Sequence, residues 1–437
     1  MQAKVGFIPV SGEIYDADQI RQVYERCRAM LMSSPVHIIE AASADLSDTK
    51  KTRESAALFR EKDIDLLLVL FCSWAPENIL LQLVNELPHV PLLLWAVNQP
   101  YHLVSPCGLL SAASNLKRKN RSFYHVLGDP VPETLRKIET AARSCMAAKR
   151  LRQSRIGIVG YPPHGMVDVT FSEGDLLKLG PVLIHIDTLE LLTVSEEIDP
   201  KNVKQEISRL QDTGCEINLS EDELCESVGM YCGLKVLVQK YDLTAIGVRC
   251  WPELREERKV PVCFGLSRLS DEGITGFCEN DVNKAVVQTV LQWLTGLPAF
   301  LGDPSSLDFD TNTMVLWHCG ALGSKAAANI QDVKIKPNVF SHRGASMCFS
   351  LKEGPVTVAS LAGPVDGVFN FLVCSGVALK DVPESGNQAR IRFELPLNQL
   401  FDEMVKNGMG HHLVVGSGNV VEELKGFAVQ LGLRSIL

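Results

Sequence analysis

The last third of the chain contains carboxylates and imidazoles that stand where secondary elements should begin or end. Glu279, Asp303 and His318 each lie beside small or apolar residues, and the pair His411 and His412 precedes an apolar run. Two carboxylates with one or two imidazoles can hold a divalent cation of the Mn²⁺ type and leave positions open for substrate oxygens. These residues therefore predict a catalytic metal site.

The spacing between Glu279 and Asp303 fits a helix that leads away and an extended segment that returns. Residues 283–294 have an amphipathic pattern, with Asp281 as a cap and Gly296 as a stop. About thirteen helical residues at roughly 1.5 Å each cover about 20 Å. The six or so residues after Gly296, extended at roughly 3.3 Å each, cover about 20 Å in return. Glu279 and Asp303 can therefore meet.

Each of these residues taken alone also fits a structural role. Glu279 and Asp281 can cap the helix, and Asp303 can begin a turn. His318, which follows a short apolar run at residues 314–317, can be a core histidine with satisfied hydrogen bonds. Because all of them occur together, we favour a shared site over four separate structural roles.

The order of these residues resembles the L-fucose isomerase and L-arabinose isomerase superfamily. The resemblance rests on Glu279 followed 24 positions later by Asp303 (303 − 279 = 24), then Trp-His-Cys-Gly at residues 317–320 and the late His-His pair. Upstream, residues 155–180 and 246–271 resemble the opening of that family's second domain and the segment before its catalytic glutamate. The likeness covers most of the chain, and its N-terminal third matches as a pattern of strands and helices.

The resemblance implies interconversion of an aldose and its ketose through a cis-enediol, with Mn²⁺ on O1 and O2 of the sugar. Glu279 and Asp303 would be metal ligands and also the acid/base pair acting on C1 and C2. Mg²⁺ and Co²⁺ are expected as lesser substitutes. The substrate would be a pentose, a 6-deoxyhexose or a modified hexose.

The resemblance also implies different roles for His318, His411 and His412. His412 would be the histidine ligand, and His411 would contact the substrate. His318 matches a metal ligand of the arabinose branch, whereas the fucose branch needs no such partner. Adjacent residues on a strand face opposite ways, so both late histidines reach the sugar only if the backbone turns, as Gly408 and Gly410 would permit.

One segment departs from the family. Where the family often carries a glutamine before Pro-Glu-Leu, this chain has Trp251. An indole can stack on an apolar sugar face and donate one hydrogen bond. We therefore expect Trp251, and Arg249 in the same segment, to bind substrate, with a preference that differs from L-fucose.

The fold class expected is α/β, with two Rossmann-like α/β domains ahead of a mostly antiparallel β-barrel or sandwich domain. Residues 1–151 alternate buried strands with helices, which is typical of a parallel sheet flanked by helices. A second α/β domain, residues 152–296, carries Glu279. The expected strands of these two domains are at residues 5–10, 36–40, 66–71, 91–96, 155–160, 182–187 and 245–248, and the expected helices are at 18–32, 52–62 and 132–151.

The β-rich domain is predicted at residues 297–437. Short alternating or apolar runs appear there between Gly, Pro and Asn, and a final helix is expected at residues 420–431. This domain would carry Asp303, His318, His411 and His412. The metal site would lie where it meets the second α/β domain.

Composition excludes several classes of function. The net charge of −9 disfavours nucleic acid as a partner, since phosphate binding depends on clustered Lys and Arg. The apolar runs are too short to span a bilayer, and the first residues lead straight into an apolar strand without a secretory pattern. We expect a cytoplasmic protein without a membrane partner.

The 13 cysteines include no Cys-x-x-Cys pair and fit reduced thiols better than a disulfide framework. Five of them gather around the proposed site segments, namely Cys232, Cys250, Cys263, Cys278 and Cys319. A zinc–thiolate site therefore stays open beside the alternative that these are small buried hydrophobes.

Two other classes of function also stay open. A sugar-binding or regulatory protein could use the two α/β domains as a clamp without catalysis, and it would not need both carboxylates close to a histidine. A metal-dependent hydrolase or lyase could use the same ligands, but no motif for a positioned water is visible. The family completes its site from a neighbouring subunit, so the resemblance implies a homo-oligomer, a trimer or hexamer.

Overall fold

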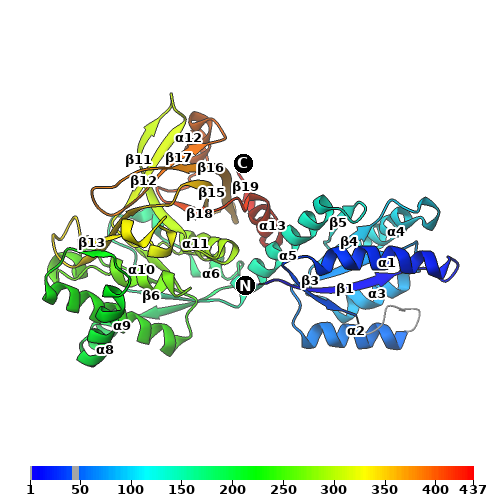
Figure 1. Cartoon of the computed structure of the whole chain (residues 1–437), viewed down its shortest axis with the longest axis horizontal. Coiled ribbons are helices and arrows are strands. Elements are labelled where there is room, and N and C mark those ends of the chain that lie inside the picture. Colours follow the sequence, from blue (N-terminus) through cyan, green and yellow to red (C-terminus); the bar gives the residue numbers. More distant parts are fainter. Residues whose placement is uncertain (1, 42–48) are drawn as a thin grey trace. The chain divides into compact units, whose positions relative to one another are not determined.

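The computed structural model describes residues 2–41 and 49–437. The chain divides into two compact units, Met1–Lys149 and Arg150–Leu437, and helix α5 (Pro132–Arg152) carries the backbone across the boundary (Figure 1). The predicted α/β class is confirmed, since parallel sheets flanked by helices occur together with a large mixed sheet. The division into three domains at residues 151 and 296 stays a prediction.

The first unit contains a five-stranded parallel sheet in the order β2-β1-β3-β4-β5. Its strands are β1 (Lys4–Val10), β2 (His37–Glu40), β3 (Leu66–Phe71), β4 (Leu92–Ala96) and β5 (Tyr124–Leu127). Its helices, besides α5, are α1 (Ala17–Met32), α2 (Thr49–Glu61), α3 (Glu77–Glu86) and α4 (Ser105–Arg118).

Strand β3 explains why this sheet appears in the sequence as continuous apolar runs. Leu66, Leu68 and Leu70 belong to a core cluster with residues of α1 and α5. The residues between them, including Leu67 and Val69, belong to a second cluster with residues of α2, α3 and α4. Both faces of the sheet are covered, so every residue of β3 must be apolar.

The second unit begins with a four-stranded parallel sheet in the order β10-β9-β6-β7. Its strands are β6 (Arg155–Val159), β7 (Val182–Ile186), β9 (Ala245–Val248) and β10 (Thr275–Cys278). The helices of this part are α6 (Glu173–Leu176), α7 (Thr188–Glu196), α8 (Pro200–Gln211), α9 (Glu221–Tyr241), α10 (Cys263–Asp271) and α11 (Val282–Thr295). Glu279 follows β10 directly, at the carboxyl edge where open α/β sheets place their ligands.

The strands after residue 297 form a ring. Antiparallel pairings run from β16 through β15, β18, β11, β12 and β17, and β17 pairs again with β16. The ring strands are β11 (Phe300–Asp308), β12 (Thr313–His318), β15 (Gly354–Val365), β16 (Val368–Leu379), β17 (Asn387–Phe393) and β18 (Leu413–Ser417). Further pairings add β8 (Glu216–Ile217), β13 (Lys334–Pro337), β14 (Ala345–Ser350) and β19 (Arg434–Ser435).

Two α-helices follow residue 297 in the chain, and the sequence pattern predicted one of them. Helix α13 (Val421–Leu431) matches the expected final helix, whereas α12 (Leu397–Lys406) falls in a region expected to contain strands. Leu397, Leu400 and Met404 of α12 are buried at helical spacing. About two turns of buried apolar contact therefore decide this element, which is too short a pattern to stand out between two strands.

The three strands that matter most for the site are neighbours in the ring. Strand β11 lies between β18 and β12, with Gly302 opposite Leu413 and Asp303 opposite Trp317. Gly302 and Asp303 of β11 therefore lie between the start of β18 and the end of β12, so Asp303, His318 and His412 come from adjoining positions of neighbouring strands. Among the described residues, no helix has both the length and the apolar character that crossing a membrane requires.

Candidate active site

Glu279 leaves the parallel sheet through two consecutive residues in the left-handed conformation. Glu279 has φ of 59° and Asn280 has φ of 53°, an uncommon pair for residues other than glycine. The buried amide of Asn280 stabilises the turn, because its Nδ2 donates to the carbonyl oxygens of Val159 at 2.9 Å and Tyr161 at 3.3 Å. The turn brings Glu279 Oε2 to 3.3 Å from His412 Nε2.

Asp281 connects the start of α11 to the same histidine. One carboxylate oxygen accepts the Lys284 backbone N–H at 3.1 Å, which confirms the predicted helix cap. The other oxygen lies 2.9 Å from His412 Nδ1. Asp281 is therefore more than a cap, because it also fixes which nitrogen of His412 faces the carboxylates.

His412 has its second nitrogen directed between two carboxylates. Nε2 lies 3.3 Å from Glu279 Oε2 and 3.5 Å from Asp303 Oδ1. Both Nε2 and Asp303 Oδ1 are buried, and neither meets the geometry of a hydrogen bond to any described residue. Buried polar atoms are rarely left without a partner. A nitrogen and an oxygen left in this way, beside the Glu279 Oε2 oxygen, fit the donor set of a divalent cation.

His318 joins this group from the end of β12. Its side chain is buried, and its ring centroid lies 5.7 Å from that of His412. Glu279, His318 and His412 each offer a ligand atom within 4.8 Å of the others, and so do Asp303, His411 and His412. The structure thus brings together the four predicted metal ligands.

His411 lies at the rim of the site. Its Nδ1 lies 2.5 Å from Asp168 Oδ2, and its Nε2 lies 3.8 Å from Asp303 Oδ1. The backbone turns just before it at Gly410, where φ is 73°. The turn places the half-buried His411 and the buried His412 on the same cluster, with ring centroids 4.0 Å apart.

The carboxylates and imidazoles of the cluster stabilise one another's charged forms. Burial alone would lower the pKa of His412, but the carboxylates of Asp281 and Glu279 raise it to about 9. Burial would likewise raise the pKa of Glu279, and the neighbouring His412 and His318 hold it below its usual value. A divalent cation bound here would take the place of the protons that these imidazoles hold.

A cavity of about 280 Å³ opens onto this cluster. Its lining residues are Met166, Trp251, Arg255, Glu279, Asp303, Trp317, His318, Cys319 and Phe340. Trp317 and Phe340 meet edge to face with centroids 6.0 Å apart, and the Arg255 guanidinium lies 4.6 Å from the Phe340 ring centre. The cavity therefore offers carboxylates and imidazole together with aromatic faces and one cation.

Trp251 and Arg249, which were both predicted to bind substrate, differ in position. Trp251 lines the cavity, and its indole N–H donates to Glu256 at 2.6 Å. Arg249 pairs with Glu253 at 2.7 Å and is not among the described residues that line the cavity. The structure thus brings Trp251 to the cluster and leaves Arg249 outside the cavity wall.

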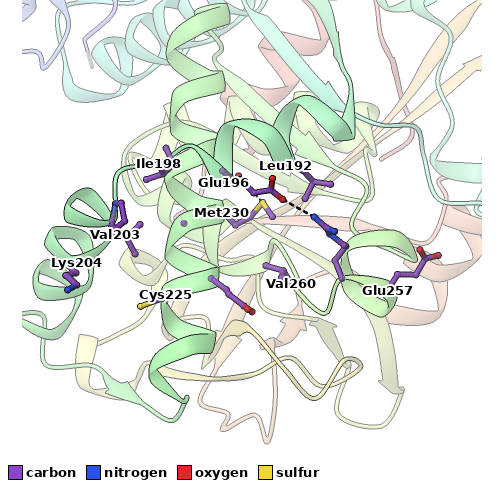
Figure 2. A pocket seen from close by; sticks show the side chains of 14 residues that line it. Leu192, Glu196, Ile198, Val203, Lys204, Cys225, Met230, Glu257 and Val260 are labelled. Atoms are coloured by element: carbon purple, nitrogen blue, oxygen red, sulfur yellow. Dashed lines mark hydrogen bonds and ion pairs between the residues drawn. The ribbon is translucent and has the colours of Figure 1, made fainter.

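A larger cavity of about 650 Å³ lies elsewhere in the second unit (Figure 2). Side chains of α7, α8 and α9 line it, among them Leu192, Val203 and Met230, and the ion pair of Glu196 with Arg258 lies at its edge. It contains none of the predicted ligands. We therefore assign the chemistry to the smaller cavity.

Some residues of the site were not identified from the sequence. Asp168 pairs with His411, Lys284 donates to the carbonyls of Leu361 and Met409, and Arg255 lines the cavity. A signal existed for Lys284, because it is the one charged residue of α11 (Val282–Thr295), whose other residues are apolar or uncharged. No local pattern marked the other two.

The comparisons with known proteins agree with this site. Residues 6–152 match the family model described as fucose/sulfoquinovose isomerase, N-terminal domain. The chain is 23% identical over 440 residues to the sulfoquinovose isomerase of Priestia megaterium, with 98% of each chain covered. It is 26% identical over 462 residues to the sulfoquinovose isomerase of a Clostridium species, with 99% of this chain and 98% of that protein covered.

Solved structures give a weaker comparison. The glucose–galactose binding protein GanP of Geobacillus stearothermophilus is 10% identical, covers 67% of this chain and 92% of its own, and has a TM-score of 0.18. That score carries no argument about fold.

Together these matches support the fucose isomerase-like superfamily for this chain. The resemblance on which the sequence analysis depended is therefore confirmed, and the enzyme class is that of a sugar isomerase.

Lys284 offers a test of how the site is supported. Its buried ammonium donates to the Leu361 carbonyl at 2.9 Å and the Met409 carbonyl at 3.0 Å. Lys284→Met would leave both carbonyls and the nearby Asp281 carboxylate without this cation, so we expect a loss of roughly 3–5 kcal/mol in the free energy of unfolding. Urea unfolding would measure it, with Lys240→Met, at an exposed position of α9, as a control that should change stability by less than about 1 kcal/mol. A loss at Lys284 no larger than that of the control would contradict this assignment.

Proposed function

We propose that this protein is a divalent-metal-dependent aldose–ketose isomerase that acts on a sugar with an acidic substituent. The observation that carries the proposal is the convergence of Glu279, Asp303 and His412, with two buried ligand atoms left without hydrogen-bond partners. A sugar-binding protein has no need for this arrangement. An isomerase needs both a cation and two groups that move protons.

The donor set favours Mn²⁺, with Mg²⁺ or Co²⁺ as substitutes. Glu279, Asp303, His412 and His318 would hold the cation, and carboxylate oxygens with imidazole nitrogens suit Mn²⁺. When bound, the cation would stabilise the negative charge that develops on the sugar oxygens O1 and O2. Asp281 supports this set from outside by orienting His412.

Glu279 and Asp303 would move the protons. One carboxylate takes the proton from C2 of the aldose while O1 gains a proton, which gives the cis-enediol. The same pair then removes the O2 proton and delivers a proton to C1, which gives the ketose. Atoms and electrons balance without a further reactant. Both carboxylates lie within 3.5 Å of His412 Nε2, so they can serve the two neighbouring carbons of one sugar.

The lining of the cavity also supports an acidic substituent. Arg255 is the cationic residue of the lining, and its buried Nε has no hydrogen-bond partner among the described residues. A guanidinium suits a multi-oxygen anion, because it presents several donors in one plane. Since the relatives are named sulfoquinovose isomerases, a sulfonated sugar is the substrate that we propose.

The reaction can be tested without assuming the substrate. Incubation with Mn²⁺ and a panel of aldoses and ketoses in D₂O should introduce deuterium at C1 or C2. Glu279→Gln and Asp303→Asn should each reduce the exchange by at least about 100-fold, because an amide cannot exchange the proton. Glu173→Gln, an exposed change elsewhere in the same unit, is the control. Sugar binding without deuterium in any product would favour a binding protein instead.

Metal titration should distinguish the roles of His411 and His412. His412→Ala should weaken Mn²⁺ binding by more than the roughly 10–100-fold cost of losing an outer-shell partner. His411→Ala should leave Mn²⁺ affinity nearly unchanged and raise KM, because His411 lies at the exposed rim. His185→Ala, at another exposed imidazole–carboxylate pair, is the control. Reversed results for the two variants would exchange their assignments.

Arg255 should decide between acidic and neutral sugars. Arg255→Gln should raise KM for a sulfonated sugar by about 10–100-fold, since a charge-assisted hydrogen bond contributes roughly 1.5–3 kcal/mol. KM for a neutral sugar should not change in the same way. Arg258→Gln, at the other cavity, is the matched control. An equal effect on KM for both sugars would show that Arg255 supports the cavity without binding the acidic substituent.

A further inference from the structure

Four buried cysteines lie together behind His318. Cys250, Cys263, Cys278 and Cys319 come from separate segments, and all are at most 8% exposed. The sulfurs of Cys263 and Cys319 lie 3.5 Å apart. The Cys278 thiol interacts with those of Cys250 and Cys319. The fold thus gathers thiols that the sequence places up to 69 positions apart (319 − 250 = 69).

The spacing of these atoms suits a thiophilic metal. Cys278, His318 and Cys319 each offer a ligand atom within 4.8 Å of the others, and Cys319 Sγ lies 3.4 Å from His318 Nδ1. Zinc binds sulfur at about 2.3 Å and imidazole nitrogen at about 2.0–2.1 Å in a tetrahedron. That geometry separates neighbouring ligand atoms by roughly 3.5–3.8 Å. Small side-chain shifts would therefore complete the site.

An entry path exists for such an ion. Cys319 lines the same cavity as Glu279 and Asp303. Cys263 lies against the other side of Cys319, so it stands where a further sulfur ligand is needed. Each thiol that binds would release its proton to solvent.

His318 belongs to both ligand sets. Its Nδ1 faces the thiol of Cys319, and the histidine is also grouped with Glu279 and His412. One imidazole would thus connect a set of hard oxygen ligands to a set of soft sulfur ligands, and the two sets select different metals.

We propose that Cys278, Cys319 and His318, with Cys263 beside them, form a second metal site for a thiophilic cation such as Zn²⁺ or Cd²⁺. Occupation of this thiol site draws His318 away from the carboxylate cluster and inhibits turnover. The proposed metal binding rests on the thiols alone. Only the proposed inhibition depends on the isomerase function.

Direct binding tests the first part. Cd²⁺ added to the reduced, metal-free protein should produce thiolate-to-metal charge-transfer absorption that saturates at one equivalent. Cys278→Ser and Cys319→Ser should each weaken the binding at least 10-fold and reduce the absorption. Cys374→Ser, at a buried thiol of β16 outside the cluster, should change neither. Unchanged Cd²⁺ affinity in both cluster variants would overturn the proposal.

A second measurement needs no variant and guards against misfolding. X-ray absorption of the Zn²⁺-loaded wild-type protein should find sulfur neighbours at about 2.3 Å from the metal. A first shell of only nitrogen and oxygen would place zinc in the carboxylate cluster and overturn the thiol site.

The inhibition is tested separately. Zn²⁺ should slow Mn²⁺-dependent deuterium exchange in the wild type, and Cys319→Ser should resist it at least 10-fold better, with Cys374→Ser as the control. Equal inhibition of all three proteins would overturn the competition. If the wild type shows no exchange at all, the proposed isomerase function fails, while the absorption and X-ray results still decide the thiol site.

Discussion

The site depends on the hydrogen bond between His412 and Asp281. Asp281 begins α11 and His412 precedes β18, and they are 131 positions apart in the sequence. Because Nδ1 faces Asp281, Nε2 can face only the space between Glu279 and Asp303. The contact therefore fixes the orientation of a proposed metal ligand and also joins the helix after the parallel sheet to a strand of the ring.

The same region holds several charged groups away from water, which is costly unless each is paired. Asp281 is stabilised by the Lys284 ammonium as well as by His412, and these hold its pKa below the usual value although burial opposes this. Lys284 in turn donates to two backbone carbonyls. The left-handed residues Glu279 and Asn280 are stabilised by hydrogen bonds from Asn280. Strain and buried charge thus occur where the chemistry needs a fixed geometry.

The residues around the cluster fall into groups of different chemistry. His318 lies within ligand distance of Glu279 and His412, and also of the Cys278 and Cys319 thiols. Aromatic residues and Arg255 form a further part of the cavity wall. With the proposed hard cation beside these thiols, the protein would have to discriminate between metals, and ligand type is the main means by which proteins do so.

The sequence by itself determined much about this protein. Glu279, Asp303 and the histidines were identified by type and spacing, and the helix and strand between the carboxylates follow from local periodicity and caps. Buried strands such as β3 were visible because both of their faces are covered. These features depend on residues close together in the chain, so their pattern is readable without the fold.

Only the tertiary structure decided how these segments meet. It gave Asp281 a second partner, brought Asp168 to His411, set His318 between carboxylates and thiols, and placed Arg255 in the cavity while leaving Arg249 outside it. Helix α12 also depends on packing, because its short apolar pattern did not predict a helix. Each of these outcomes depends on contacts between residues far apart in the sequence, and such contacts are set by how sheets, helices and turns pack together rather than by any local run of residues.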